Sequence, residues 1–158
     1  FSTPRVRSVV ERMPDARFLY LVRDPAEALP SFLSMWWEKW VSHTPEIQKD
    51  GPEAKQLVQL AYDYYDYALG LLDDLGPDQI LVVNYEDLTQ DPDEEVHRIY
   101  DWLGIEMSPA FKQNLYEFTH AQRCYESSHD YTLADFGLTR DEVYEGAKRF
   151  CARFGFKR

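Results

Sequence analysis

The chain has 158 residues, of which 44% are hydrophobic and 28% charged, a balance typical of one globular domain and unlike that of a disordered segment. Its 17 basic and 28 acidic residues give a net charge of −11, which argues against nucleic acid as a partner, and no apolar run is long enough to span a membrane. Two cysteines, Cys124 and Cys151, are too few for a disulfide scaffold and fit either a reducing compartment or indifference to redox, and the protein is expected to be cytoplasmic.

The first third of the chain alternates between predicted helix and predicted strand. Apolar residues at spacings of three and four, after the N-cap pair Thr3-Pro4, predict a helix over residues 3–13. Residues 18–22 are a continuous apolar run, Phe-Leu-Tyr-Leu-Val, which is typical of a parallel strand buried on both faces. A helix should follow, because Asp24-Pro25-Ala26-Glu27 combines an N-cap, a proline at the first position and a capping-box glutamate. Pro30, in its second turn, should kink this helix.

The rest of the chain contains one more predicted strand among several helices. Residues 57–75 carry a long apolar stripe that ends at Gly76-Pro77 and predicts a helix. Residues 80–83, Ile-Leu-Val-Val, are the second candidate for a buried strand. The remaining predictions are helices from Asp91 to a C-cap at Gly104, from Ser108 onward and from Thr139 to about Phe154, with an irregular segment over residues 123–137.

This order of helices and strands predicts an α/β fold in which helices flank a parallel sheet. Two parallel strands alone do not make a stable core, so further strands must come from elsewhere. We expect them in an N-terminal half of the same domain, missing ahead of Phe1, and a partner chain is the alternative source. Residues 1–158 are therefore interpreted as the C-terminal part of a single domain.

Arg23 and Ser31 are the residues best placed for binding chemistry. In open α/β sheets, ligands bind beyond the carboxyl ends of the strands, and Arg23 stands at such an end. Ser31 follows eight residues later, and the helix between them rises roughly 10 Å at about 1.5 Å per residue. A guanidinium and a hydroxyl so placed could share one phosphate. Two alternatives stay open, namely a surface ion pair between Arg23 and Asp24 and a merely solvated Ser31.

Three segments, in this order, resemble those of a known enzyme family. Residues 14–25, Pro-Asp-Ala-Arg-Phe-Leu-Tyr-Leu-Val-Arg-Asp-Pro, followed by Ser31, resemble the 3′-phosphate-binding element of sulfotransferases that use 3′-phosphoadenosine 5′-phosphosulfate (PAPS). Residues 83–88, Val-Asn-Tyr-Glu-Asp-Leu, with Asp91-Pro92, are similar to that family's second recurrent segment. Residues 131–139, Tyr-Thr-Leu-Ala-Asp-Phe-Gly-Leu-Thr, are similar to the C-terminal signature of its bacterial-type branch.

The resemblance implies a transferase with a P-loop NTPase-like sheet. Such an enzyme moves a sulfuryl group from PAPS to an acceptor hydroxyl or amine and releases 3′-phosphoadenosine 5′-phosphate (PAP), with no metal required. By resemblance, Arg23 and Ser31 would bind the 3′-phosphate. Tyr62 would lie against the adenine, unless it is one more ring of a tyrosine-rich helix. His129 and Tyr131 would belong to a loop that closes over the nucleotide, unless that loop is simply exposed.

Two parts of the family pattern have no counterpart in these residues. None of the seven isolated glycines forms a Gly- and Ser/Thr-rich phosphosulfate loop, and no residue matches the family's catalytic histidine. Both would lie in the expected N-terminal half, so no catalytic residue is assigned to this chain. The first 23 residues hold five arginines against two acidic residues, a local excess of positive charge that would attract a polyanionic nucleotide.

Two other functions stay open at this point. The chain could belong to a relative that binds an adenosine bisphosphate without catalysis, or to a P-loop nucleotide kinase, which would need metal ligands and a Walker-type loop. Neither of the kinase features is visible, and four histidines and two cysteines show no metal-ligand spacing. The acceptor is expected to be a small molecule, a carbohydrate or a lipid. Trp36, Trp37 and Trp40 lie at helical spacing and are predicted to be core, with an acceptor pocket as the alternative.

Overall fold

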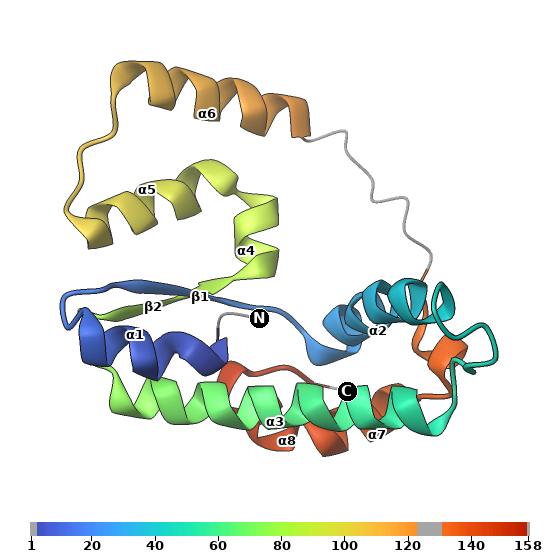
Figure 1. Ribbon diagram of the computed structural model, residues 1–158. Helices are drawn as coiled ribbons and strands as arrows, with labels where there is room; N and C mark the ends of the chain where they lie inside the picture. The colour runs from blue at the N-terminus through green and yellow to red at the C-terminus, as the bar shows by residue number, and fades with distance from the viewer. Residues whose placement is uncertain (1–2, 123–130, 158) are drawn as a thin grey trace. The chain divides into compact units, whose positions relative to one another are not determined.

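The computed structural model of the chain describes residues 3–122 and 131–157, which form two compact units (Figure 1). The first, which we call the helical unit, comprises residues 3–8, 24–74 and 131–157. The second, the sheet unit, comprises residues 9–23 and 75–122.

Two parallel strands form the centre of the sheet unit. Strand β1 (Phe18–Val22) pairs along its whole length with β2 (Ile80–Asn84), with Phe18 opposite Ile80 and Val22 opposite Asn84. Three helices follow β2 in the chain and stack in succession on one side of the strands (Figure 1). These are α4 (Tyr85–Gln90), α5 (Pro92–Leu103) and α6 (Pro109–Gln122). The predicted α/β fold with a parallel sheet flanked by helices is thereby confirmed.

Helices α4, α5 and α6 each begin after a residue whose side chain accepts from one of the first N–H groups of the helix. The Asn84 side chain accepts from the N–H of Glu86 and caps α4, and the Asp91 side chain accepts from that of Glu94 and caps α5. Gly104 ends α5 in the left-handed conformation at φ 68°, as predicted for a glycine C-cap. The Ser108 hydroxyl accepts from the N–H of Phe111 at the start of α6. Local sequence therefore fixes these boundaries.

One prediction about β1 is wrong. The apolar run indicated a strand buried on both faces, but the side chains of Leu19 and Leu21 are each 50% exposed, whereas Val22 is buried. Successive side chains of a strand point to opposite faces, so both exposed leucines lie on one face. Among the described residues, nothing covers that face enough to bury them.

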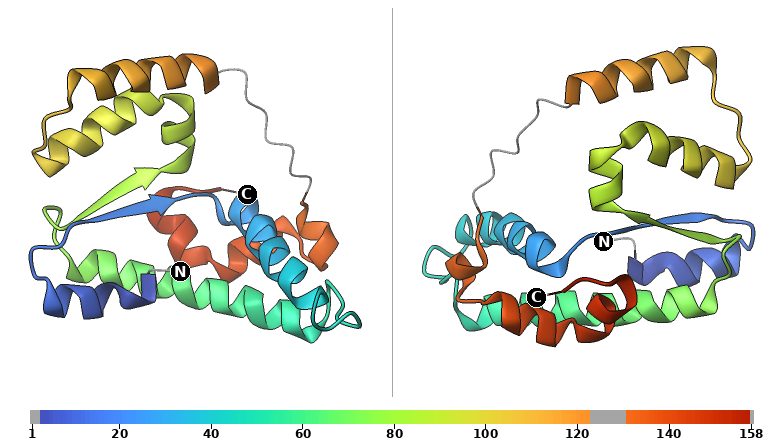
Figure 2. Two further views of the ribbon diagram at one scale, coloured as in Figure 1. Left: turned by 45° about the horizontal axis from the view of Figure 1, so that its top comes forward. Right: turned by 180° about the vertical axis from the view of Figure 1, so that it is seen from behind.

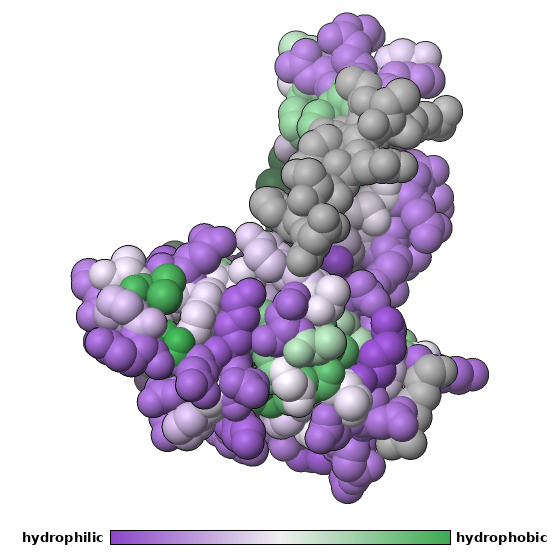
Figure 3. Space-filling model, turned by 90° about the vertical axis from the view of Figure 1, so that its right-hand side faces the viewer, coloured by the Kyte–Doolittle hydropathy of each residue, from purple (hydrophilic) through white to green (hydrophobic). Residues whose placement is uncertain are grey.

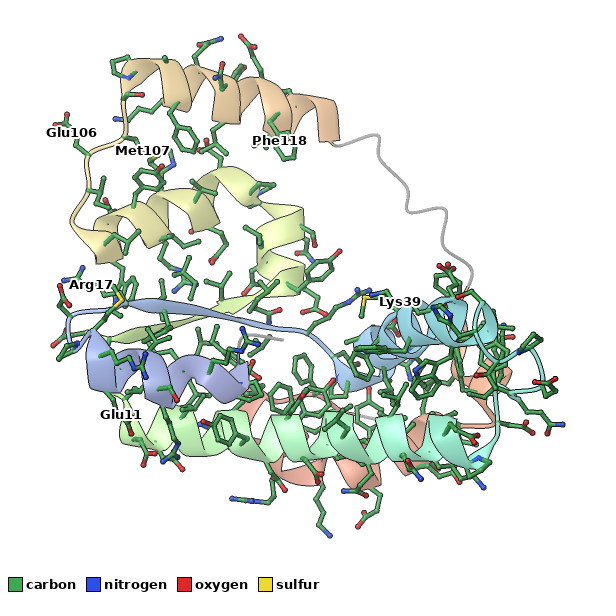
Figure 4. All side chains as sticks on the ribbon, viewed as in Figure 1. Glu11, Arg17, Lys39, Glu106, Met107 and Phe118 are labelled. Atoms are coloured by element: carbon green, nitrogen blue, oxygen red, sulfur yellow. The ribbon has the colours of Figure 1, made fainter. Side chains whose placement is uncertain are left out.

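A side chain also links the start of β1 to the end of α5 within the sheet unit. The Arg17 guanidinium donates to the carbonyl oxygens of Trp102 and Leu103, 3.1 and 2.9 Å away, at the C-terminal end of α5. These carbonyls have no partner within their own helix, so the arginine satisfies them. Figure 4 shows Arg17 at the end of β1 opposite to the one followed by Arg23.

The helical unit is built on two long helices. They are α2 (Pro25–Val41) and α3 (Pro52–Asp74), and the C-terminal helices α7 (Arg140–Gly146) and α8 (Lys148–Phe154) run along α3 (Figure 2). A short 3-10 helix, η2 (Leu133–Phe136), packs against α2. The shared core contains Ala26, Leu29, Leu33, Leu57, Val58, Ala61, Leu133, Phe136, Val143, Tyr144, Ala147 and Cys151. Trp36, Trp37 and Trp40 pack against this core, which confirms their predicted structural role.

Three local predictions need correction. The chain start is a 3-10 turn, η1 (Thr3–Arg5), followed by α1 (Val6–Arg12), instead of one helix over residues 3–13. Helix α2 includes Pro30 within its span, and the kink expected there stays a prediction. The predicted last helix is divided at Ala147, whose backbone (φ −105°, ψ 24°) leaves the helical region, and part of the segment expected to be irregular forms η2.

One face of the molecule is mostly polar. On the face drawn in Figure 3, hydrophilic residues predominate and hydrophobic ones occupy small patches. Among the described residues, no helix has the length and apolar character that crossing a membrane requires.

Candidate nucleotide site

Arg23 directly follows β1, and its side chain is held by an aromatic ring. Its guanidinium carbon lies 4.4 Å from the centre of the Tyr85 ring, a cation–π contact within the sheet unit. Tyr85 is the first residue of α4, so the Asn84 cap at the end of β2 also fixes this ring. No carboxylate of the described residues forms an ion pair with Arg23. The guanidinium is thus oriented by a neutral partner that leaves its N–H donors available to an anion.

Asp24, the next residue, has its partners in the helical unit. Its Oδ1 accepts from the N–H of Ala26 at 2.8 Å, which caps α2 as predicted. Its Oδ2 accepts from the Tyr144 hydroxyl at 2.7 Å. The alternative prediction, an ion pair between Arg23 and Asp24, is therefore not observed, since each side chain is engaged within its own unit.

Ser31 lies on an exposed face of α2, and Tyr131 contacts the same face. Glu27 and Glu38 lie four residues before and seven residues after Ser31, so the three share one face of the helix. The Tyr131 hydroxyl donates to Oε1 of Glu38 at 3.1 Å. Beside this contact lies a cavity of about 410 Å³ lined by Glu27, Pro30, Tyr131, Thr132 and Arg140, together with Ala26, Leu133, Ala134 and Leu138. The helix that carries Ser31 and the predicted loop residue Tyr131 thus border the same hollow.

Tyr62 is packed inside the helical unit. Its ring lies so close to Gly146 that a Cβ at residue 146 would overlap the ring carbons. The side chain is half-buried, and this burial, with the nearby Glu142 charge as a smaller cause, raises the pKa of its phenol. These contacts fit the alternative of a packed tyrosine, while its predicted position against adenine remains a prediction. His129 lies outside the described residues.

The described residues offer neither a cluster of metal ligands nor an activated thiol. No group of three or more His, Cys, Asp or Glu side chains within residues 3–122 and 131–157 is arranged to hold a metal ion. Burial raises the pKa of the Cys151 thiol to about 11, so the group is protonated at neutral pH. A buried thiol of this kind has a packing role.

The comparison with protein families decides which group of proteins this chain belongs to. The model described as "Sulfotransferase family" matches residues 1–109. The chain belongs to the sulfotransferase family. The matched range contains Arg23, Ser31 and Tyr62, whereas Tyr131 lies beyond it.

Curated relatives and solved structures agree with this assignment. The sulfotransferase chain is 28% identical, over 98% of its length, to an "omega-hydroxy-beta-dihydromenaquinone-9 sulfotransferase", Stf3, of Mycobacterium bovis, and equally to that of Mycobacterium tuberculosis. It spans about two fifths (39%) of those relatives. Its fold matches sulfotransferase STF9 from Mycobacterium avium with a TM-score of 0.83 at 18% identity, covering 99% of this chain and 40% of that one. The sulfotransferase domain of the curacin biosynthetic pathway matches with a TM-score of 0.58 at 16% identity. This match covers 95% of this chain and 58% of that one.

Sequence reasoning missed three residues around the candidate site. Tyr85 was noted only as part of the segment 83–88 that is similar to the family's second recurrent segment, and its ring lies against the Arg23 guanidinium. Tyr144 and Arg140 contact the start of α2 from a helix more than a hundred residues away in the chain. Only the capping box at Thr139, which predicts where α7 begins, gave any signal of their placement.

Proposed function

We propose that this sulfotransferase chain forms the 3′-phosphate and adenine side of a PAPS site, as the C-terminal part of a single domain. Arg23 and Ser31 bind the 3′-phosphate, Tyr131 and His129 border the nucleotide, and Tyr62 supports its adenine end. The whole protein transfers the sulfuryl group of PAPS to an acceptor and releases PAP. The rest of the domain supplies the phosphosulfate loop and the base.

The proposal rests on the position of the Arg23 guanidinium and on the partners around it. Its guanidinium stands at the carboxyl end of β1, where ligands of open α/β sheets bind. It is oriented by the Tyr85 ring, and none of the described carboxylates is paired with it. An arginine presented in this way suits an anionic ligand, because its planar fork can donate two hydrogen bonds to one phosphate.

The exposed face of α2 supports the same assignment. A phosphate beside Ser31 would be repelled by unpaired carboxylates, but Arg140 binds Glu27 and the Tyr131 hydroxyl binds Glu38. The cavity next to this face is lined partly by polar side chains, including those of Thr132 and Tyr131. Arg140 thus compensates the charge of Glu27, and the Glu38 carboxylate is hydrogen-bonded, on the face where the 3′-phosphate is proposed to lie.

The chain's own residues would position the donor in this mechanism and would not perform the transfer step. Fixing the 3′-phosphate orients the nucleotide, which lowers the entropic cost of aligning the sulfuryl group with the acceptor. We propose an acceptor hydroxyl, carried by a small molecule, a carbohydrate or a lipid, because the name of the Stf3 relatives specifies a hydroxylated substrate.

Calorimetric titration of the full-length protein with PAP and with AMP tests this proposal. AMP lacks the 3′-phosphate, so it cannot receive the charged hydrogen bonds of Arg23. Each such bond contributes roughly 1.5–3 kcal/mol, so PAP should bind about 10- to 150-fold more tightly than AMP. Equal affinities for the two nucleotides would refute the proposed role of this chain.

A further inference from the structure

The hydrogen bonds between β1 and β2 show which residues of β1 face the partner strand. Phe18 lies opposite Ile80 in the register, and the Phe18 N–H donates to the Gln79 carbonyl oxygen at 2.8 Å. In a parallel pair, alternate residues direct both of their backbone groups to the neighbouring strand, and the residues between them direct theirs away from it. The N–H and C=O groups of Leu19 and Leu21 therefore point to the other edge of β1.

This other edge of β1 is open in the part of the chain that the structure describes. None of the described residues donates to or accepts from the backbone of Leu19 or Leu21. Their side chains, which share one face of the strand, are each 50% exposed. A strand with uncovered edge groups and uncovered apolar side chains is a template for pairing with another strand.

The outer edge of β2, by contrast, is occupied by groups of the same unit. By the same alternation, Ile80 and Val82 direct their backbone groups away from β1. The Ile80 N–H donates to the Gly76 carbonyl oxygen at 3.1 Å, and the Val82 carbonyl oxygen accepts from Nη2 of Arg98 at 3.0 Å. The same Nη2 donates to Oε2 of Glu95 at 2.6 Å, which holds the guanidinium in place. A charged side chain laid over a strand edge hinders the addition of another strand.

The occupant of the open edge has to belong to the same folded domain. Two parallel strands alone do not form a stable sheet, so the pairing at β1 must exist whenever the protein is folded. This chain spans only 39% of the curated relatives and 40% of the STF9 structure, so most of each relative lies outside the matched part. A second copy of this chain would reach β1 only when two molecules associate, so it would not supply a permanent pairing.

We propose that a strand from the rest of the domain joins the sheet at the free edge of β1, through the backbone groups of Leu19 and Leu21, and that β2 is the last strand on its side. The inference rests on one part of the proposed function, namely that residues 1–158 are the C-terminal part of a single domain. In the whole protein β1 is then an inner strand with both edges paired, which agrees with its unbroken apolar run.

Hydrogen exchange of single backbone amides in the full-length protein tests the proposal without any substitution. The Leu19 and Leu21 amides should exchange at rates within about tenfold of that of the Tyr20 amide, which faces β2. The Val82 amide faces the outer edge of β2 and is the matched control, and it should exchange roughly 100-fold faster than the Leu19 amide. Leu19 and Leu21 amides that exchange as fast as the Val82 amide would overturn the proposal.

Dilution separates the proposed occupant from a second copy of the chain. Protection of Leu19 and Leu21 by the rest of the same molecule should persist when the protein is diluted until light scattering shows only monomers. Protection that is lost on this dilution would assign the edge to a second copy and would also overturn the proposal.

Proline substitution at the two edges gives an independent test. Proline has no N–H, and a strand tolerates it only where that group faces an unpaired edge. Leu19→Pro should therefore lower the urea midpoint of unfolding of the full-length protein by roughly 1 M more than Leu19→Ala does. Val82→Pro is the matched control, and its midpoint should stay close to that of Val82→Ala. Equal losses for the two prolines, each measured against its alanine variant, would contradict the proposal.

Two further outcomes are decided by the same measurements. If Leu19→Pro does not fold while Leu19→Ala and Val82→Pro do, the result supports the proposal, and exchange in the wild-type protein remains the direct test. A wild-type protein that prefers PAP to AMP but leaves the Leu19 amide unprotected would overturn the inference and leave the nucleotide site intact. Equal affinities for PAP and AMP with a protected Leu19 amide would instead refute the proposed nucleotide site alone.

Discussion

Replacing Arg23 with alanine should weaken PAP binding by roughly 10- to 150-fold and leave AMP binding nearly unchanged. The expected size corresponds to one charged hydrogen bond, at about 1.5–3 kcal/mol. The PAP affinity of Arg23→Lys should lie between those of the wild type and Arg23→Ala, because lysine retains the charge but lacks the planar fork of donors. Calorimetry with both nucleotides measures these effects directly.

Arg17→Ala is the matched control for this experiment. Arg17 lies at the other end of β1, and its guanidinium binds the last carbonyl oxygens of α5. The variant removes the same charge and should lower stability slightly without affecting the preference for PAP. If Arg17→Ala and Arg23→Ala weaken PAP binding equally, general electrostatic attraction explains the affinity and the specific role of Arg23 is wrong.

Gly146→Ala should lower the free energy of unfolding by about 1–3 kcal/mol, the usual effect of inserting a group where the packing leaves no room for it. A Cβ at residue 146 would overlap the ring of Tyr62, which is half-buried and packs against the core of the helical unit. Either the ring or α7 must move to accommodate the methyl group. Urea unfolding of the full-length protein, followed by circular dichroism, measures the change.

Gly70→Ala is the opposite case and serves as the control. Gly70 lies within α3, and the nearest atom to a Cβ there is Nη2 of Arg7, at an ordinary contact distance of 3.6 Å. Alanine should therefore stabilise the helix by about 0.5–1 kcal/mol. A Gly146→Ala protein as stable as the wild type would contradict the observed packing of Tyr62 against α7.

Local sequence predicted the helix ends and the strands well, because capping depends on a few neighbouring residues. The caps at Asp24, Asp91, Gly104 and Thr139 lie where the residue types indicated. Strand β1 was expected over its observed range, and β2 extends one residue beyond the predicted end. Helix α2 continues through Pro30 although proline removes one backbone hydrogen bond, and the kink expected there stays a prediction.

Features that depend on distant residues could not be predicted. An apolar run indicates that a strand can be buried, but it does not indicate which residues cover the strand. The side chains of Leu19 and Leu21 are half exposed. The Tyr85 ring beneath Arg23 depends on the parallel pairing of β1 with β2, which brings the ends of both strands together. The contact of Tyr144 with Asp24 joins residues 120 positions apart. No local pattern encodes such a pairing.

The central claim is that Arg23 and Ser31 bind one phosphate, and a crystal structure of the full-length protein with PAP tests it most directly. Oxygen atoms of the 3′-phosphate should lie within hydrogen-bond distance, about 2.7–3.2 Å, of both the Arg23 guanidinium and the Ser31 hydroxyl. Density for the 3′-phosphate away from these two side chains, with PAP otherwise well ordered, would contradict the account.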